Sequence, residues 1–138
     1  MNLNRIALLF LCAAMVGCAS TRENLLDSDA DALKLRSIQA RAFDTTDKEK
    51  TLRTIIATLQ DLSFVVDKAD ATLGSVSATK LDGAATRITV TVRPRGEKQL
   101  IIRANVQYGV RAVKDPVPYQ QFFTSLEKSM FLTAQQVD

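Results

Sequence analysis

Apolar and polar residues alternate along two neighbouring runs of the chain. Residues 87–93 alternate Arg or Thr with Ile or Val, and residues 99–112 repeat the alternation over a longer run. One face of this run carries Leu100, Ile102, Ala104, Val106, Tyr108, Val110 and Ala112. A period of two predicts strands that each bury one face. We expect a hairpin at 94–97 between the two strands, and a bulge or bend at Gly109.

A strand and a helix are predicted upstream of this region. Residues 38–42 alternate in polarity, which predicts a strand. Thr46 and Glu49 have the spacing of a capping box, in which side chains satisfy two free amides at the start of a helix. The helix itself is predicted by an apolar stripe at 3.6-residue spacing: Leu52, Ile55, Ile56, Leu59 and Leu62.

Two short strands and a final helix complete the predicted elements. The strands are expected at 64–66 and 75–80, with turns at Gly74 and at Asp82-Gly83. Pro118 suits the first turn of a helix. That helix would bury an aromatic-rich stripe: Tyr119, Phe122, Phe123, Leu126, Met130, Ala134 and Val137.

The order of these elements, β-α-β-β-β-β-α, predicts an α+β fold. We expect an antiparallel β-sheet with two helices packed on one face. The opposite face would present Thr, Arg, Gln and Asn to solvent.

Composition excludes several functions. The 138 residues suffice for one domain, and a net charge of +3 without dense basic and aromatic clusters argues against nucleic-acid binding. The chain has no histidine, the commonest general base and metal ligand. It also has no G-x-S-x-G, P-loop or G-x-G-x-x-G motif. We therefore predict a protein that is not an enzyme and binds no metal.

Two groups of carboxylates are candidates for a metal site or a catalytic pair. An EF-hand loop that started at Asp27 would need Gly and Glu where the chain has Ala32 and Ile38. Asp67 and Asp70 lie at a strand end, where Asp commonly bonds the backbone of a turn. Neither group predicts a metal site or a catalytic pair.

The N-terminus carries a short apolar run that ends at a cysteine. The run 6–16 is too short to span a bilayer and has the length of the apolar part of a signal peptide. It leads into Met15, Val16, Gly17 and Cys18, which resemble the lipobox of bacterial lipoproteins. Leucine is usual at the first lipobox position, where this chain has Met15.

The lipobox resemblance implies a lipid anchor and a division of the chain. A diacylglycerol would be attached to Cys18 by a thioether, cleavage would follow before it, and the new amine would receive an acyl chain. No other cofactor is expected. Residues 1–17 would be the removed signal peptide, residues 18–35 an acidic flexible linker with at most a nascent helical turn, and residues 36–138 the folded domain.

The same resemblance implies a location. The residue after the cysteine is Ala19 and not the Asp that retains such proteins in the inner membrane. This implies anchoring in the outer membrane of a Gram-negative bacterium, on its periplasmic face. Two or more acyl chains hold a protein on a membrane stably.

A basic segment suggests how the domain would act. Basic residues outnumber acidic ones by eight to three between Lys80 and Asp115. The candidate interaction face comprises Arg87, Arg93, Arg95, Lys98, Arg103 and Arg111. Such a face would meet an acidic protein, lipid phosphates or an anionic glycan. The alternative is a solvated face without a partner.

Two functions follow from this reading. The arrangement is similar in topology to small helix-on-sheet domains of outer-membrane assembly lipoproteins, such as BamC-type domains. The phrases SIQARAFDTTD, LQDLSFVVDKAD and LGSVSATK also resemble a group of uncharacterised Gram-negative lipoproteins. We expect a non-catalytic accessory or assembly subunit of an envelope complex for transport, secretion or efflux. The alternative is a periplasmic binder of a lipid, peptidoglycan fragment or anionic glycan.

Overall fold

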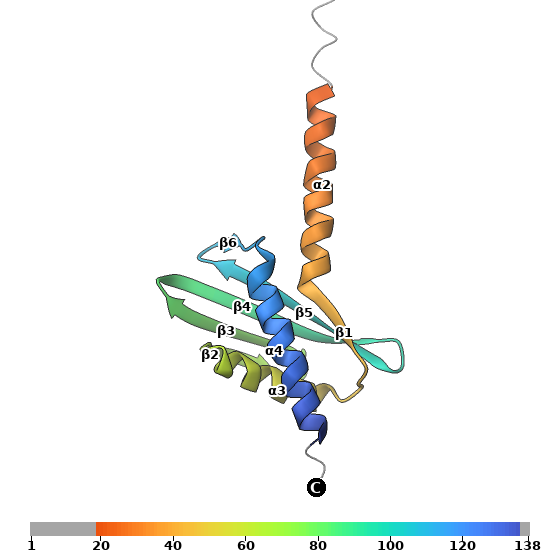
Figure 1. The fold of residues 1–138 in the computed structure, drawn as a ribbon, viewed down its shortest axis with the longest axis vertical. Helices are drawn as coiled ribbons and strands as arrows, with labels where there is room; N and C mark the ends of the chain where they lie inside the picture. Colours follow the sequence, from red (N-terminus) through yellow and green to blue (C-terminus); the bar gives the residue numbers. More distant parts are fainter. Residues whose placement is uncertain (1–18, 136–138) are drawn as a thin grey trace, which may run out of the picture. The chain divides into compact units, whose positions relative to one another are not determined.

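A computed structural model describes the backbone of residues 19–135 and the side chains of residues 28–131 (Figure 1). The elements are α2 (Ala19–Gln39), β1 (Ala40–Phe43), α3 (Lys48–Asp61), β2 (Val65–Asp70), β3 (Ser75–Asp82), β4 (Ala84–Arg95), β5 (Gln99–Tyr108), β6 (Arg111–Ala112) and α4 (Pro116–Gln135). The contacts of the chain divide it into two units, which separate between Lys34 and Leu35.

The second unit has the predicted α+β class, with an antiparallel sheet. The strand order is β1-β5-β4-β3-β2, and β6 pairs with β5 beside β1. Helices α3 and α4 pack together on one face of this sheet (Figure 1). The buried core lies between the two helices and the sheet. It is built from the even-numbered positions of β3, β4 and β5 and from the apolar stripes of both helices.

The predicted element order was wrong at its start. Residues 19–35 were expected to form a flexible linker and residues 38–42 a strand. The structure instead has helix α2 over Ala19–Gln39, so that the described chain has three helices and β1 begins at Ala40. The segment contains no Gly or Pro and is rich in Ala, Leu and charged residues that favour helices. Its acidic residues concealed this preference, because they also suit a solvated linker.

Helix α3 begins one residue later than the capping-box spacing predicted. Its N-cap is Asp47, whose Oδ1 accepts a hydrogen bond from the Lys50 amide at 2.9 Å. An Asp side chain is as good a cap as Thr, and here it replaces Thr46 in that role. The buried face of α3 is also more polar than the predicted stripe. It includes Thr51, Thr54 and Thr58, whose hydroxyls each donate to the backbone carbonyl four residues earlier.

The long strand predicted over 99–112 is two strands. β5 ends at Tyr108, the chain reverses through Gly109 and Val110, and β6 pairs back with Arg111 opposite Tyr108. Gly109 has a φ of 59°, the left-handed conformation that a tight hairpin requires and Gly adopts at little cost. Val110 is therefore 95% exposed and does not belong to the core.

The Tyr119 side chain joins the end of β5 to the segment that precedes α4. Tyr119 is fully buried, and its hydroxyl accepts a hydrogen bond from the Val106 amide at 3.3 Å. The same hydroxyl donates to the Val113 carbonyl at 2.8 Å. Since a buried unpaired amide is costly, this one side chain supports both the sheet edge and the segment that leads into α4.

Candidate functional site

The face of the sheet opposite α3 and α4 is the broadest candidate surface. No other element of residues 40–135 packs on it, because both helices contact the even-numbered side of the strands. Its centre consists of small polar residues: Ser75, Ser77, Thr79, Thr89, Thr91 and Asn105. These side chains are short, so they leave the middle of this open face without long projecting groups.

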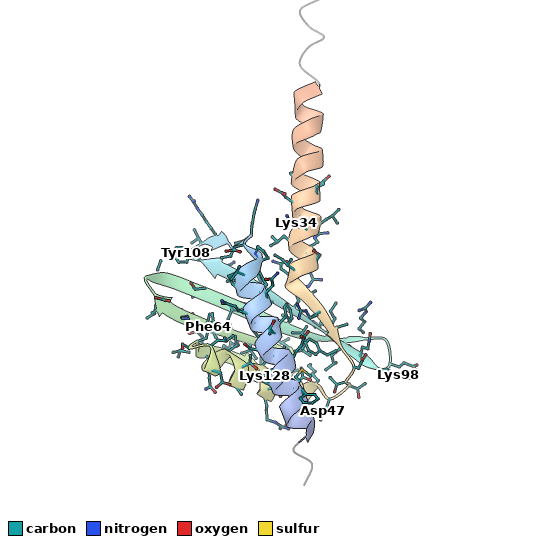
Figure 2. All side chains as sticks on the ribbon, in the orientation of Figure 1. Lys34, Asp47, Phe64, Lys98, Tyr108 and Lys128 are labelled. Atoms are coloured by element: carbon teal, nitrogen blue, oxygen red, sulfur yellow. The ribbon has the colours of Figure 1, made fainter. Side chains whose placement is uncertain are left out.

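Four cations gather at one end of the open face. Arg93 and Arg95 follow each other on the same side of β4, about 7 Å apart for a two-residue step along a strand. Arg103 lies opposite Thr91 and is therefore the diagonal neighbour of Arg93. Lys98 lies in the turn that joins β4 to β5, and Figure 2 labels it there. We call Arg93, Arg95, Lys98 and Arg103 the basic end.

The basic end has few compensating charges. All four residues are exposed, and none forms an ion pair within the part of the chain whose side chains are described. Two carboxylates are close along the chain or across the register: Glu97, and Asp44, whose Oδ1 accepts a hydrogen bond from Gln99 at 2.6 Å. Adjacent like charges repel each other, so an anionic partner would relieve this repulsion.

The other two predicted members of the basic face lie elsewhere. Arg87 is on the open face, but six residues before Arg93 along β4, which is about 20 Å at the rise of a strand. Arg111 lies on the opposite side of the sheet, because it pairs with Tyr108 and directly opposed residues share a face. The structure thus brings four of the six candidates together.

The helix side of the sheet contains a cavity next to α4. It has a volume of about 220 Å³, and its apolar walls include Leu62, Phe64, Ile88, Val106 and Phe122. Lys80, Asp82 and Gln121 add polar groups to the lining. Ligand pockets commonly measure about 300–1,000 Å³, so this cavity suits only a small group or the end of a chain.

A second cavity, of about 340 Å³, lies between the start of α3 and the later turns of α4. Its walls combine Phe43, Met130 and Phe131 with the polar residues Asp44, Lys50 and Thr54. The Thr54 hydroxyl donates to the Lys50 carbonyl, so it is already engaged within the helix. The Asp44 carboxylate in the same lining accepts a hydrogen bond from Gln99, so two of the polar side chains of this cavity are engaged elsewhere in the fold.

The predicted lipidation site lies outside the described residues. This applies to Cys18 and to the lipobox residues Met15, Val16 and Gly17, so the anchor remains a prediction from the sequence. Within the described residues, no helix is both long and apolar enough to cross a membrane. No three metal-ligating side chains come together in that same part of the chain.

One surface feature was missed by the sequence analysis. Tyr108 and Val110 were assigned to the core, but they are 52% and 95% exposed. Leu81, at the end of β3, is 83% exposed. The signal was Gly109, which marks a chain reversal and not a bulge within one strand.

No family model matches this chain, and no curated protein matches its sequence.

Proposed function

We propose that this protein is a lipid-anchored lipoprotein of the outer membrane that faces the periplasm and serves as a non-catalytic accessory subunit of an envelope complex. Its domain would dock through the basic end on an acidic segment of a partner in a transport, secretion or efflux assembly. The anchor rests on the lipobox at residues 15–18. The docking rests on four exposed cations without ion pairs among the described side chains.

The flatness of the open face favours a protein partner. Small hydroxyl and amide side chains adjoin the basic end, and they leave room for an extended or flat surface to approach. Complementary charge mainly accelerates association and selects the partner. The partner should therefore be lost in high salt. Exposed charges act over about 8 Å at physiological ionic strength, and added salt shortens this distance further.

The test is recovery of crosslinked partners from detergent-solubilised envelopes. A triple variant, Arg93→Gln with Arg95→Gln and Arg103→Gln, should lose most of the partner protein that the native chain recovers. A control triple, Arg36→Gln with Lys50→Gln and Lys128→Gln, removes the same charge from exposed positions outside the basic end and should retain it. Equal recovery by both triples would contradict docking at the basic end.

The anchor is tested separately by mass spectrometry of the N-terminal peptide. The expected peptide begins at Cys18 and carries a diacylglycerol and an acyl chain, and Cys18→Ser should abolish both the lipid and membrane retention. An unmodified Cys18 in a chain that keeps residues 1–17 would contradict the lipoprotein proposal.

A second candidate function is binding of a lipid, peptidoglycan fragment or anionic glycan. The observation in its favour is the cavity beside α4, where an apolar floor adjoins the Lys80 ammonium. Native mass spectrometry with added fatty acids or muropeptides should then detect a complex that Lys80→Gln weakens and Lys128→Gln does not. Its small volume places this function second.

A further inference from the structure

Two turns lie side by side at the end of the sheet remote from the basic end. The first, at Gly83, joins β3 to β4, and the second, at Gly109 and Val110, joins β5 to β6. The Gly109 amide donates a hydrogen bond to the Ala85 carbonyl at 3.0 Å, which holds the turns together. Figure 2 labels Tyr108 at this end and Lys98 at the other. We call residues 80–87 and 108–115 the hairpin tip.

The hairpin tip exposes apolar side chains that the fold does not use. Val110 is 95% exposed, Leu81 is 83% exposed and Tyr108 is 52% exposed. Leu81 and Ala85 oppose each other on the open face, whereas Tyr108 lies on the helix side of the sheet. Val110 lies in the turn that follows Tyr108, so the exposed apolar groups lie on both sides of this end of the sheet and at its apex. Turns favour Gly, Asn, Asp and Ser, so a β-branched Val at the apex of a two-residue turn has no local explanation.

The same tip carries excess positive charge. Its four cations are Lys80, Arg87, Arg111 and Lys114, and its two carboxylates are Asp82 and Asp115. Asp115 accepts a hydrogen bond from the Val117 amide at 3.0 Å, at the start of α4. Lys80, Thr86, Tyr108 and Arg111 follow one another across the register and so share a side of the sheet.

We propose that the hairpin tip docks on the surface of a lipid bilayer that contains anionic phospholipids. Exposed aliphatic groups with an interfacial tyrosine and flanking Lys and Arg are the composition that favours the boundary between headgroups and acyl chains. The apolar groups lie in or beside two turns and on both sides of the sheet, so a deformable bilayer covers them more readily than a rigid partner would.

This inference rests on the proposed lipid anchor, which would keep the domain beside a membrane. Three apolar side chains bind a bilayer weakly on their own. A tether raises the effective concentration of the tip at the surface, so weak contacts become occupied. The anchor and the tip would then hold the domain at two points and orient the basic end away from the bilayer, since the two ends lie at opposite ends of β5.

The experiment places an environment-sensitive fluorophore at the tip of the full chain, reconstituted through its anchor into vesicles that contain phosphatidylglycerol. A thioether-linked Cys18 does not react with the label, and Cys12 leaves with the signal peptide, so Val110→Cys is the one reactive thiol. The matched control is Leu73→Cys, a 56% exposed apolar residue in the turn at the other end of β3.

We expect the label at position 110 to shift its emission to the blue and to be quenched by a nitroxide-labelled lipid, whereas the label at position 73 does neither. The tip contact should weaken with Arg111→Gln and Lys114→Gln and strengthen with Asp82→Asn, because the surface is anionic. Burial of one exposed leucine corresponds to about tenfold or more in partitioning, so Leu81→Ser should weaken the partitioning of the tip into the bilayer by at least about that factor.

Two outcomes would overturn the inference. Equal, water-exposed emission at both positions would show that the tip does not reach the bilayer. A blue shift at position 110 without lipid quenching would show that a protein covers the tip. Failure of the anchor is seen separately as an unmodified Cys18 peptide. A chain with Cys12→Ser and Cys18→Ser beside Val110→Cys is then labelled and added to preformed vesicles, where absence of lipid quenching at position 110 again contradicts the docking.

Discussion

Tyr119 stabilises the fold through both its ring and its hydroxyl. Its ring fills the core with Phe122 and Phe123, while its oxygen bridges the Val106 amide and the Val113 carbonyl. These two backbone groups belong to β5 and to the segment before α4, which are separated by the β5–β6 hairpin. The side chain therefore joins three parts of the chain whose order in sequence does not suggest a common contact.

Tyr119→Phe should lower the free energy of unfolding by about 1–2 kcal/mol, because the Val106 amide loses a buried acceptor while the ring still packs. The measurement is urea unfolding followed by circular dichroism. Tyr108→Phe is the matched control, since Tyr108 is 52% exposed and its hydroxyl makes no hydrogen bond within the described residues. Equal stability of the two variants would contradict the bridging role.

Gly74 lies where the backbone conformation and a neighbouring strand both exclude a larger side chain. It is buried at a φ of 65°, and its carbonyl accepts a hydrogen bond from the Val92 amide at 2.8 Å. A Cβ at this position would lie 2.7 Å from the Val92 carbonyl oxygen and 2.5 Å from Lys48 Cε. The lysine end can move, but the backbone oxygen cannot move without disturbing the β3–β4 pairing.

Gly74→Ala should therefore destabilise the domain more than Gly96→Ala. Both positions have a left-handed φ, which costs about 1–2 kcal/mol for a residue with a Cβ, but a Cβ at Gly96 would contact nothing within 4 Å. The difference between the two thermal unfolding temperatures measures the close approach alone. If the two variants unfold at the same temperature, the backbone contact at Gly74 is not limiting.

At the scale of elements, α3 depends on a cap that the sequence alone misplaced. Thr46 with Glu49 satisfies the pattern of a capping box, yet Asp47 also stands three residues before an amide that it can accept from. Local patterns do not decide between adjacent caps of similar strength. In the structure the chain leaves β1 through a turn at Phe43–Thr45, and the Asp47 amide donates a hydrogen bond to the Thr45 hydroxyl just before the helix begins.

Asp47→Ala should cost about 1 kcal/mol of stability, because the Lys50 amide loses its acceptor, whereas Thr46→Ala should change little. Thermal unfolding of the two variants beside the native chain provides the comparison. A larger loss in the Thr46 variant would restore the capping box as the start of α3.

The alternating strands were the part of the fold that sequence could predict. β3, β4 and residues 99–106 of the predicted long strand have the expected buried faces, because period two directly reflects which side meets the core. The pattern failed from Tyr108 onward, since Tyr108, Val110 and Ala112 continue the alternation of the sequence but are exposed, while the chain reverses at Gly109 into β6.

The candidate site was predicted to the same extent. Arg93, Arg95 and Arg103 fall on one face because hairpin register follows from alternation and turn position. The prediction that Arg111 shares this face was wrong, because the chain reverses at Gly109 and places Arg111 on the other side of the sheet. The pair Arg41–Glu127, 2.6 Å apart, joins β1 to α4 across 86 residues, and no local pattern indicates such a contact.

At the scale of the whole molecule, the core belongs to the second unit. Among residues 28–131, whose side chains are described, all buried apolar residues lie at or after Leu52, and the partly buried residues packed against them begin at Leu35. Described side chains of α2 before Leu35 are exposed. The stability of the sheet should therefore not depend on residues 19–34.

A chain that begins at Leu35 should unfold at the same temperature as one that begins at Ala19. Both are compared by circular dichroism at equal concentration, and the longer chain should show only additional helical signal. A markedly lower unfolding temperature for the shorter chain would mean that residues 19–34 contribute to the core.

The edges of the sheet have a consequence for self-assembly. One edge is divided between the four-residue β1 and the two-residue β6, while the other, β2, has a bulge between Val66 and Lys68 beside the charged Asp67. Neither edge offers a long, straight row of free backbone groups to a second copy. Cross-β stacking needs such rows on both sides of every copy, so these interrupted edges make the stacking of copies unfavourable even at high protein concentration.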